Sequence, residues 1–407
     1  KNPPKHIKAR QMKVIHPVPK LGINYFIMLG ILKRKGEKVK KDRSGIKVGI
    51  PKFLNIWGTH QFWVGFFNYL GIKVVFSSDT SEEQYRQYGK GRITMDSCFP
   101  VKALAGHIGE LLAKNVDILF VPMIYSLPSF LRGHVLDTVS CTRVMMAPEN
   151  IKAGFTREKD EFSSRGIKFI SPFVTFGEPE LLPKQLYEAL KEFLDLSYQE
   201  VTQAVKHGLK SLEEFDAYIR GKSLEIVKWC VKENKPAILV LARPYHMDTG
   251  IGHEIDVEFQ TYGYPVLWYN YLPLDDWLLN WLFGQEVKAG IIKSPFDISD
   301  VWTSSYSSNT NEIIWAAKFA CRFPWITGVI RLSSYECGMD QPTFTPVQRI
   351  VESRGTLYFK FGELDETKPA GSIKIRVETI VYYLEKYSAD IINKKLSMLP
   401  PLPKELS

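Results

Sequence analysis

The stretch IKVGIPKFLNIWGTHQFWVGFFNYLGIKVVF, residues 46–76, has the pattern of a strand, a helix and a second strand in succession. Ile46–Ile50 and Ile72–Phe76 are short apolar runs of the kind that form buried strands. Between them, the aromatic segment Thr59–Gly71 has helical spacing and ends in a glycine, which is a common signal for a helix C-terminus. Strands that alternate with helices at this spacing predict an α/β fold with a mostly parallel sheet.

This alternation continues along the chain. Residues 182–234 differ, because their pattern is charged and helical, and we interpret them as a helical connector between two α/β halves. Further strands are predicted at Val116–Pro122, Ile167–Phe173, Pro236–His246 and within residues 264–269, 325–334 and 356–361. Further helices are predicted at Val101–Lys114, Gly252–Tyr262, Asn309–Phe323, Pro346–Ser353 and Ser372–Tyr387.

The sequence therefore divides into five parts. Residues 1–45 form a basic N-terminal extension or linker, and residues 46–181 form a first α/β domain. The helical connector spans 182–235, the second α/β domain spans 236–390, and residues 391–407 form a C-terminal tail.

The net charge of +9 is concentrated in the extension. Of the 53 Lys and Arg and the 44 Asp and Glu, 13 and 2 lie in residues 1–45, which leaves 40 and 42 for the rest of the chain. This pattern favours a solvated linker or docking arm, with an RNA- or membrane-binding arm as the alternative, and nucleic-acid binding by the body of the protein is not expected. The apolar run Leu21–Leu32 is shorter than the roughly 20 residues that cross a bilayer, so no membrane span is expected.

Five cysteines at scattered spacings, without a visible signal peptide, argue against a disulfide framework and favour a reducing, cytoplasmic setting. Cys230 and Cys321 stand at helical spacing from apolar neighbours and are predicted to be core residues. The other three cysteines lie in polar surroundings, so each needs a different explanation.

Cys98 directly precedes a helix whose first turn can take Pro100, so a thiolate there would be stabilised by free backbone N–H groups and the helix dipole. Cys141 lies in a polar segment between a strand and the next helix. Cys337 follows a strand end, and the adjacent Gly338 would let the backbone approach closely. Loops beyond the carboxyl ends of parallel strands line ligand-binding crevices, so the three thiols could meet and bind an iron–sulfur cluster. Their spacing alone leaves open that they are separate structural thiols.

Several segments together resemble the 2-hydroxyacyl-CoA dehydratase family, including the related part of long proteins known as CoA-substrate-specific enzyme activases. They run in the family's order from about residue 46 to residue 387, and together they are far more specific than one motif. The segments are VGIPKFLNIWGTHQFWVGFFNYLGIKVVFS, DSCFPVKALAGHIGELLAKNVDILFVPM, ARPYHMDTGIGHEI, DVWTSSYSSNTNEIIWAAKFACRFP, SSYECGMDQPTF and KPAGSIKIRVETI.

The resemblance implies two Rossmann-like domains that enclose an iron–sulfur cluster held by Cys98, Cys141 and Cys337. At Cys141 the sequence departs from its relatives, which usually place a proline where Thr142 stands here. Three thiolates leave one iron of a 4Fe-4S cluster without a protein thiolate. That iron could take a substrate oxygen, or a sulfide that bridges to a second cube in an 8Fe-9S double cubane.

The implied function is the cluster-bearing component of an ATP-dependent two-component reductase or dehydratase that works under anaerobic conditions. A cluster-containing dimeric ATPase, the activase, would deliver low-potential electrons as a separate chain or a fused domain. The substrate would be a CoA thioester or a small inorganic molecule, and a second cube would come from a homodimer partner or a related subunit. No P-loop motif occurs in this chain, so ATP hydrolysis is expected elsewhere. The alternatives are a non-catalytic iron–sulfur carrier or scaffold of a redox assembly, and a metal-free α/β transferase.

Further residues around the expected pocket come from the same segments. His246 and His253 are candidate proton donors, with a purely structural role as the alternative. The remaining candidates for the substrate or cluster environment are Arg243, Ser304, Ser307, Ser334 and Gly338, and simple helix capping is the alternative for the serine-rich loop.

Overall fold

The structure is a computed structural model that describes residues 42–406 except 304 and 368. Almost all of the basic extension predicted at residues 1–45 therefore lies outside the described residues. None of the helices in the described part of the chain is long and apolar enough to cross a membrane.

The first sheet forms as the opening stretch of sequence predicts. Its order is β2-β1-β3-β5, and every pairing is parallel. The helix between β1 and β2 is α3 (His60–Tyr69), and Gly71 beyond its end has a φ of +74°, which glycine adopts without strain. The strands are β1 (Lys47–Ile50), β2 (Lys73–Phe76), β3 (Ile118–Phe120) and β5 (Lys168–Ile170).

The second sheet is also parallel and has the order β10-β9-β7-β8. Its strands are β7 (Ala237–Leu241), β8 (Val266–Trp268), β9 (Ile326–Ser334) and β10 (Leu357–Leu364). A third, two-stranded parallel sheet of β4 (Met123–Ser126) and β6 (Phe173–Thr175) was not predicted, because its strands are too short to show a pattern. The mixed α/β architecture with mostly parallel sheets is thus confirmed.

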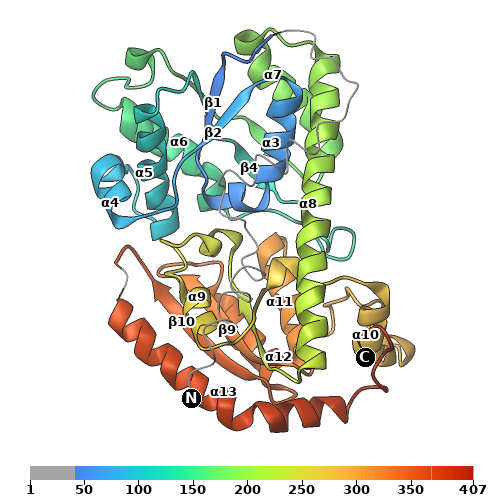
Figure 1. Cartoon of the computed structure of the whole chain (residues 1–407). Coiled ribbons are helices and arrows are strands. Elements are labelled where there is room, and N and C mark those ends of the chain that lie inside the picture. The colour runs from blue at the N-terminus through green and yellow to red at the C-terminus, as the bar shows by residue number, and fades with distance from the viewer. Residues whose placement is uncertain (1–41, 304, 368, 407) are drawn as a thin grey trace.

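In both four-stranded sheets the strand order reverses beside the first strand, because β1 lies between β2 and β3 and β7 lies between β8 and β9. Ligands of open parallel sheets bind at such reversals, outside the carboxyl ends of the strands. Segments at these ends of the two sheets meet: η1 (Leu54–Gly58), beyond β1, packs against η5 (Pro244–Met247), beyond β7. The carboxyl edges of the two sheets therefore face a common region between the upper and lower halves of Figure 1.

The helices cover the sheets and link the two halves. Their bounds are α4 (Glu82–Gln84), α5 (Phe99–Ala113), α6 (Thr142–Thr156), α7 (Leu182–Leu194), α8 (Tyr198–Lys232), α9 (Ile255–Thr261), α10 (Asp276–Lys288), α11 (Ser308–Arg322), α12 (Phe344–Glu352) and α13 (Ala370–Leu396). Helix α10 was not predicted. Helix α13 continues to Leu396, so the tail predicted from residue 391 begins as the end of a helix.

The segment predicted as a connector divides into two helices with different roles. The apolar face of α7 packs only into the core of the first sheet. Helix α8 is 35 residues long. Its first half packs into that core, whereas its second half packs into a larger cluster that contains the second sheet and also residues of the first half. Figure 1 shows α8 running beside both halves. Gly65 and Gly208 permit the close crossing of α3 and α8, since a Cβ on Gly208 would lie 2.7 Å from Phe62.

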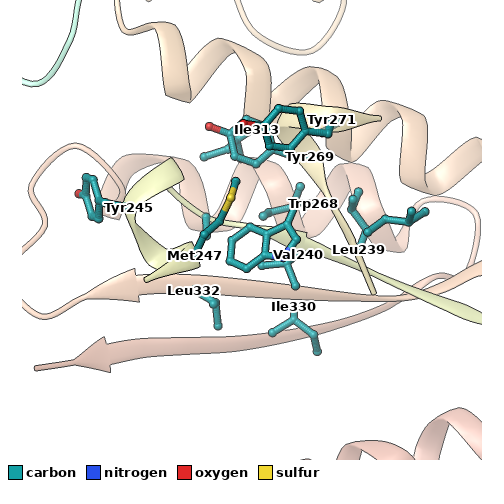
Figure 2. Packing of buried hydrophobic residues seen from close by; sticks show 14 of the residues in the cluster. Leu239, Val240, Tyr245, Met247, Trp268, Tyr269, Tyr271, Ile313, Ile330 and Leu332 are labelled. Atoms are coloured by element: carbon teal, nitrogen blue, oxygen red, sulfur yellow. The ribbon is translucent and has the colours of Figure 1, made fainter. Parts of the chain in front are cut away.

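Each sheet is buried by large apolar side chains. In the first half, Trp63 and Phe67 of α3 lie 5.0 and 5.2 Å from the ring of Phe120 on β3. In the second half, Figure 2 shows Met247 of η5 beside Trp268 of β8, and side chains of β7 and β9 belong to the same cluster. The segment beyond the carboxyl end of β7 is thus anchored in the hydrophobic core by its own side chains.

A buried histidine links α5 to the loop after β2. His107 is fully buried, with its Nδ1 2.8 Å from Ser77 Oγ and its Nε2 2.9 Å from Thr80 Oγ1. Its ring stacks on Phe53 at a centroid distance of 4.4 Å. Burial lowers the pKa of His107 from 6.5 to about 3, so this imidazole is neutral in the folded protein.

We expect His107 to make the protein less stable in mild acid. Below pH 6.5 the unfolded chain binds a proton at this residue and the folded chain does not, until the pH approaches 3. The free energy of unfolding should therefore decrease as the pH is lowered through this range, by about 1.4 kcal/mol per pH unit well below pH 6.5. Urea unfolding of the wild type and of His107→Gln between pH 7 and 4.5 measures this contribution. The variant should show a shallower pH dependence, and equal slopes would contradict the assignment.

Candidate functional site

Cys98 stands at the N-cap of α5, with Pro100 in the first helical turn. It is 7% exposed, and its carbonyl oxygen accepts the backbone N–H of Val101 at 2.9 Å. The expected stabilisation of a thiolate by the helix N-terminus does not prevail. Burial raises the pKa of the Cys98 thiol above its ordinary value, so the free thiol is protonated at neutral pH.

Cys141 stands at the N-cap of α6 and is half-buried. The preceding residues fix its position: Ser140 N–H donates to the carbonyl of Tyr125 at 2.7 Å, and Val139 N–H donates to the carbonyl of Tyr306 at 2.8 Å. The second of these bonds joins a loop of the first half to the loop before α11. Cys141 therefore lies where the two halves touch.

Cys337 lies three residues beyond β9 in a turn and is also 7% exposed. Its N–H donates to the carbonyl of Ser334 at 3.2 Å, and its own carbonyl accepts the N–H groups of Asp340 and Gln341 at 3.2 and 3.3 Å. Burial, reinforced by the Asp340 carboxylate, raises the pKa of the Cys337 thiol to about 11.

The three thiols lie within electrostatic reach of Arg243, and Cys98 lies within electrostatic reach of the other two. Cys98 interacts with Cys141 and Arg243, and Cys337 interacts with Cys98 and Arg243. Arg243 in turn interacts with Cys337 and Cys141. Segments that are distant in the sequence thus bring the three thiols into the electrostatic neighbourhood of one arginine, which follows β7.

The remaining cysteines are core residues, as predicted. Cys230 and Cys321 belong to the hydrophobic core of the second half, and burial raises the pKa of Cys230 to about 12. The Cys321 thiol donates to the carbonyl of Lys318 at 3.2 Å within its own helix.

Arg243 belongs to a buried charge cluster beside Cys337. One carboxylate oxygen of Asp340 lies 3.0 Å from Nη2 of Arg243 and 3.0 Å from Nη2 of Arg331. The other oxygen accepts the hydroxyl of Ser333 at 2.8 Å. Burial alone would raise the pKa of Asp340, but the two guanidinium groups hold it well below its ordinary value. The cluster of Arg243, Arg331 and Asp340 therefore carries one net positive charge, and each member is at most 1% exposed.

The family model described as "CoA enzyme activase uncharacterised domain (DUF2229)" matches residues 47–272. The chain belongs to this family. The matched region includes Cys98, Cys141 and Arg243, whereas Cys337 and Asp340 lie beyond it. No curated protein matches the chain.

In this activase-related chain the side chains of the two candidate histidines make hydrogen bonds to other residues of the protein. His246 Nδ1 lies 3.2 Å from both backbone polar atoms of Arg243, and Nε2 lies 3.2 Å from Ser334 Oγ. Burial lowers the pKa of His246 to about 3, so the ring is neutral at ordinary pH. His253 has a left-handed φ of +54° and donates from Nε2 to the carbonyl of Asp365 at 2.9 Å. These contacts favour positioning roles, and proton donation by either ring stays a prediction.

The other predicted pocket residues have different surroundings. Ser307 is the buried N-cap residue of α11, and it accepts the hydroxyl of Thr310 at 3.0 Å. Gly338 is exposed, and a Cβ there would meet no atom within 4 Å, so the expected close backbone approach is not observed. Ser304 lies outside the described residues.

Several buried donors around the thiols have no partner. The hydroxyls of Ser97 and Ser308 and the Nε of Arg243 make no hydrogen bond in the described part of the chain, although each residue is at most 1% exposed. Ser97 adjoins Cys98, and Ser308 donates its backbone N–H to Val139, two residues before Cys141. Buried donors without partners are costly unless a ligand accepts from them.

Sequence reasoning missed Asp340, Arg331, Ser97 and Asn309. Asn309 accepts from Nη1 of Arg243 at 3.3 Å and donates to the hydroxyl of Tyr269 at 3.2 Å. An arginine within the apolar run GVIRLSS was the available signal for Arg331, because a buried strand cannot hold a charge without a counter-charge.

No group of three or more His, Cys, Asp or Glu side chains in the described residues could hold a metal ion as the side chains stand. What the site offers is a set of three thiols, a buried net positive charge and unused hydrogen-bond donors. Together these would suit a group that thiolates can bind and that is negatively charged in its complex with them.

Removing the shared carboxylate should destabilise the protein strongly. Asp340→Asn leaves two buried guanidinium groups without a counter-charge, and we expect a loss of about 3–5 kcal/mol in the free energy of unfolding. Urea unfolding at pH 7 measures the loss. The control is Glu363→Gln, which removes one partner of an exposed ion pair with Arg376 at 3.6 Å and should cost less than about 1 kcal/mol. Equal losses in the two variants would show that the buried cluster is not held by this carboxylate.

Proposed function

We propose that this chain is the iron–sulfur cluster-bearing component of an ATP-dependent reductase or dehydratase. In this proposal Cys98, Cys141 and Cys337 hold a 4Fe-4S cluster whose fourth iron has no protein thiolate. The observation that carries it is that buried Arg243 interacts electrostatically with all three thiols, and Cys98 with the other two. The family description refers to CoA enzyme activation, which supports an enzyme-related role at a general level.

The donor set fits such a group better than a single metal ion. In a cluster each thiolate binds a different iron, so the sulfurs stand farther apart than in the shell of one ion. Thiolates are also the ligands that iron–sulfur clusters prefer. The partnerless hydroxyls of Ser97 and Ser308 and the Nε of Arg243 could donate to the sulfides of the bound group.

The residues of this chain would control the access of water to the cluster site and the protonation of its thiols. Burial raises the pKa of Cys98 and Cys337, so both thiols must lose their protons when the cluster binds, and cluster binding should be favoured by higher pH. When bound, the group would supply an open iron and one electron at a time to a substrate. Apolar packing around η5 would exclude bulk water from this region, while half-buried Cys141 would lie on the more open side.

The proposed cluster site requires a particular arrangement of the two halves. We infer that each four-stranded parallel sheet with its helices is a Rossmann-like unit, and that α8 acts as the connector. Reversal of strand order next to the first strand in both sheets supports this inference, as does the presence of α8 in both cores. The cluster would then lie in the cleft between the two units, at the carboxyl ends of their strands.

The proposed partners are those that the resemblance to the dehydratase family implies, and the sequence given contains no P-loop. A cluster-containing dimeric ATPase, separate or fused, would deliver the electrons. A second copy or a related subunit would supply another three-cysteine set if the centre is an 8Fe-9S double cubane. The substrate would be a CoA thioester or a small inorganic molecule.

Anaerobic reconstitution with iron and sulfide tests the proposal. The wild type should bind roughly four irons and roughly four sulfides per three-cysteine site. Cys98→Ala, Cys141→Ala and Cys337→Ala should each lose most of this iron. The variants Cys230→Ala and Cys321→Ala serve as matched controls and should keep it, because neither cysteine belongs to the proposed ligand set.

A colourless wild type, or equal iron loss in the core variants, would contradict the proposal and favour a metal-free enzyme. A loaded protein whose spectrum responds to no CoA thioester or small inorganic substrate would favour a non-catalytic electron carrier instead.

A further inference from the structure

We propose that Arg243 is the counter-charge of the three-thiol pocket and raises the reduction potential of the iron–sulfur group bound there. This inference rests on the proposed function, and it assigns to one residue the control of how easily the centre takes up an electron.

The position of Arg243 is fixed from three sides. Its Nη2 pairs with Asp340, its Nη1 donates to Asn309, and its backbone flanks the ring of His246. Asp340 is joined to Cys337 by a backbone hydrogen bond of 3.2 Å. The guanidinium group is thus held beside the Cys337 turn, and its Nε has no partner in the described residues.

The positive charge of Arg243 is only partly neutralised by the protein. Asp340 is shared between Arg243 and Arg331, so the buried cluster keeps one positive charge. Arg243 is the member of this cluster that lies within electrostatic reach of all three thiols. Tyr245 also interacts with Arg243, Cys98 and Cys337, but burial keeps its pKa well above 10 and the phenol neutral.

Reduction of the bound group adds one negative charge to this pocket. In the test the electron comes from dithionite, a one-electron reductant, and no proton is required to balance the step. A buried positive charge stabilises the more negative, reduced state, and burial leaves this interaction little screened by solvent. Removing the charge should therefore make the reduction potential more negative.

The experiment is a redox titration of the reconstituted holoprotein, followed by absorbance and electron paramagnetic resonance. Arg243→Gln should be at least tenfold less reduced than the wild type at a given potential, which corresponds to about 59 mV for one electron. Arg243→Lys keeps the charge and should stay close to the wild type. Arg143→Gln is the matched control: this arginine also reaches Cys98 but is exposed, so solvent should screen its effect.

A second variant tests the charge without removing the arginine. Asn309→Asp has nearly the same shape, and its carboxylate can accept from both Arg243 and the hydroxyl of Tyr269, so the fold should persist. The added negative charge should shift the potential in the same direction as Arg243→Gln.

The outcomes separate the two proposals. A wild type that binds no iron would overturn the proposed function together with this inference. A wild type that loads normally, with potentials unchanged in Asn309→Asp and in a loaded Arg243→Gln, would overturn this inference alone. Equal shifts in Arg243→Gln and Arg143→Gln would also contradict it, because burial would then make no difference.

Discussion

One carboxylate shared by two buried guanidinium groups is the constraint on which this site depends. Asp340 pairs with Arg243 from the end of β7 and with Arg331 from within β9, at 3.0 Å each. Because the two arginines come from adjacent strands, Asp340 ties the turn of Cys337 to the centre of the second sheet. Buried charges are tolerated only when they are paired, so the turn has little freedom to move. The pairing is incomplete by one positive charge, and that charge lies beside the thiols.

The sheets explain why distant segments meet here. Both place their first strand at the point where strand order reverses, and the loops beyond these strands pack on each other through η1 and η5. Gly250 shows how close this contact is, since a Cβ there would lie 2.3 Å from the carbonyl oxygen of Thr80. Asp248 adds a hydrogen bond across the same contact by accepting the N–H of Thr80 at 3.0 Å. A close backbone approach and a side-chain hydrogen bond thus fit the two halves to each other.

Much of the fold could be predicted from the sequence, because buried parallel strands appear as unbroken apolar runs and their helices as apolar repeats. The small sheet of β4 and β6 could not, since three or four residues show no periodicity. The core positions of Cys230 and Cys321 were predicted correctly from their apolar neighbours, but Cys98, predicted to lie in a loop, belongs to the same hydrophobic cluster. The charge cluster was missed because Asp340 stands in a polar loop segment, where an acidic residue usually faces solvent. The state of the Cys98 thiol could not be predicted either, because the helix N-terminus and burial act in opposite directions, and only the packing decides between them.

The most direct measurement is Mössbauer spectroscopy of wild-type protein reconstituted with iron-57. The account predicts a four-iron cluster with two kinds of iron in a ratio of roughly three to one, since three irons carry a cysteine thiolate and one does not. Binding of a substrate should alter the minority signal alone. A spectrum of mononuclear iron, or of four equivalent thiolate-bound irons, would contradict the claim that these three thiols form one open cluster site.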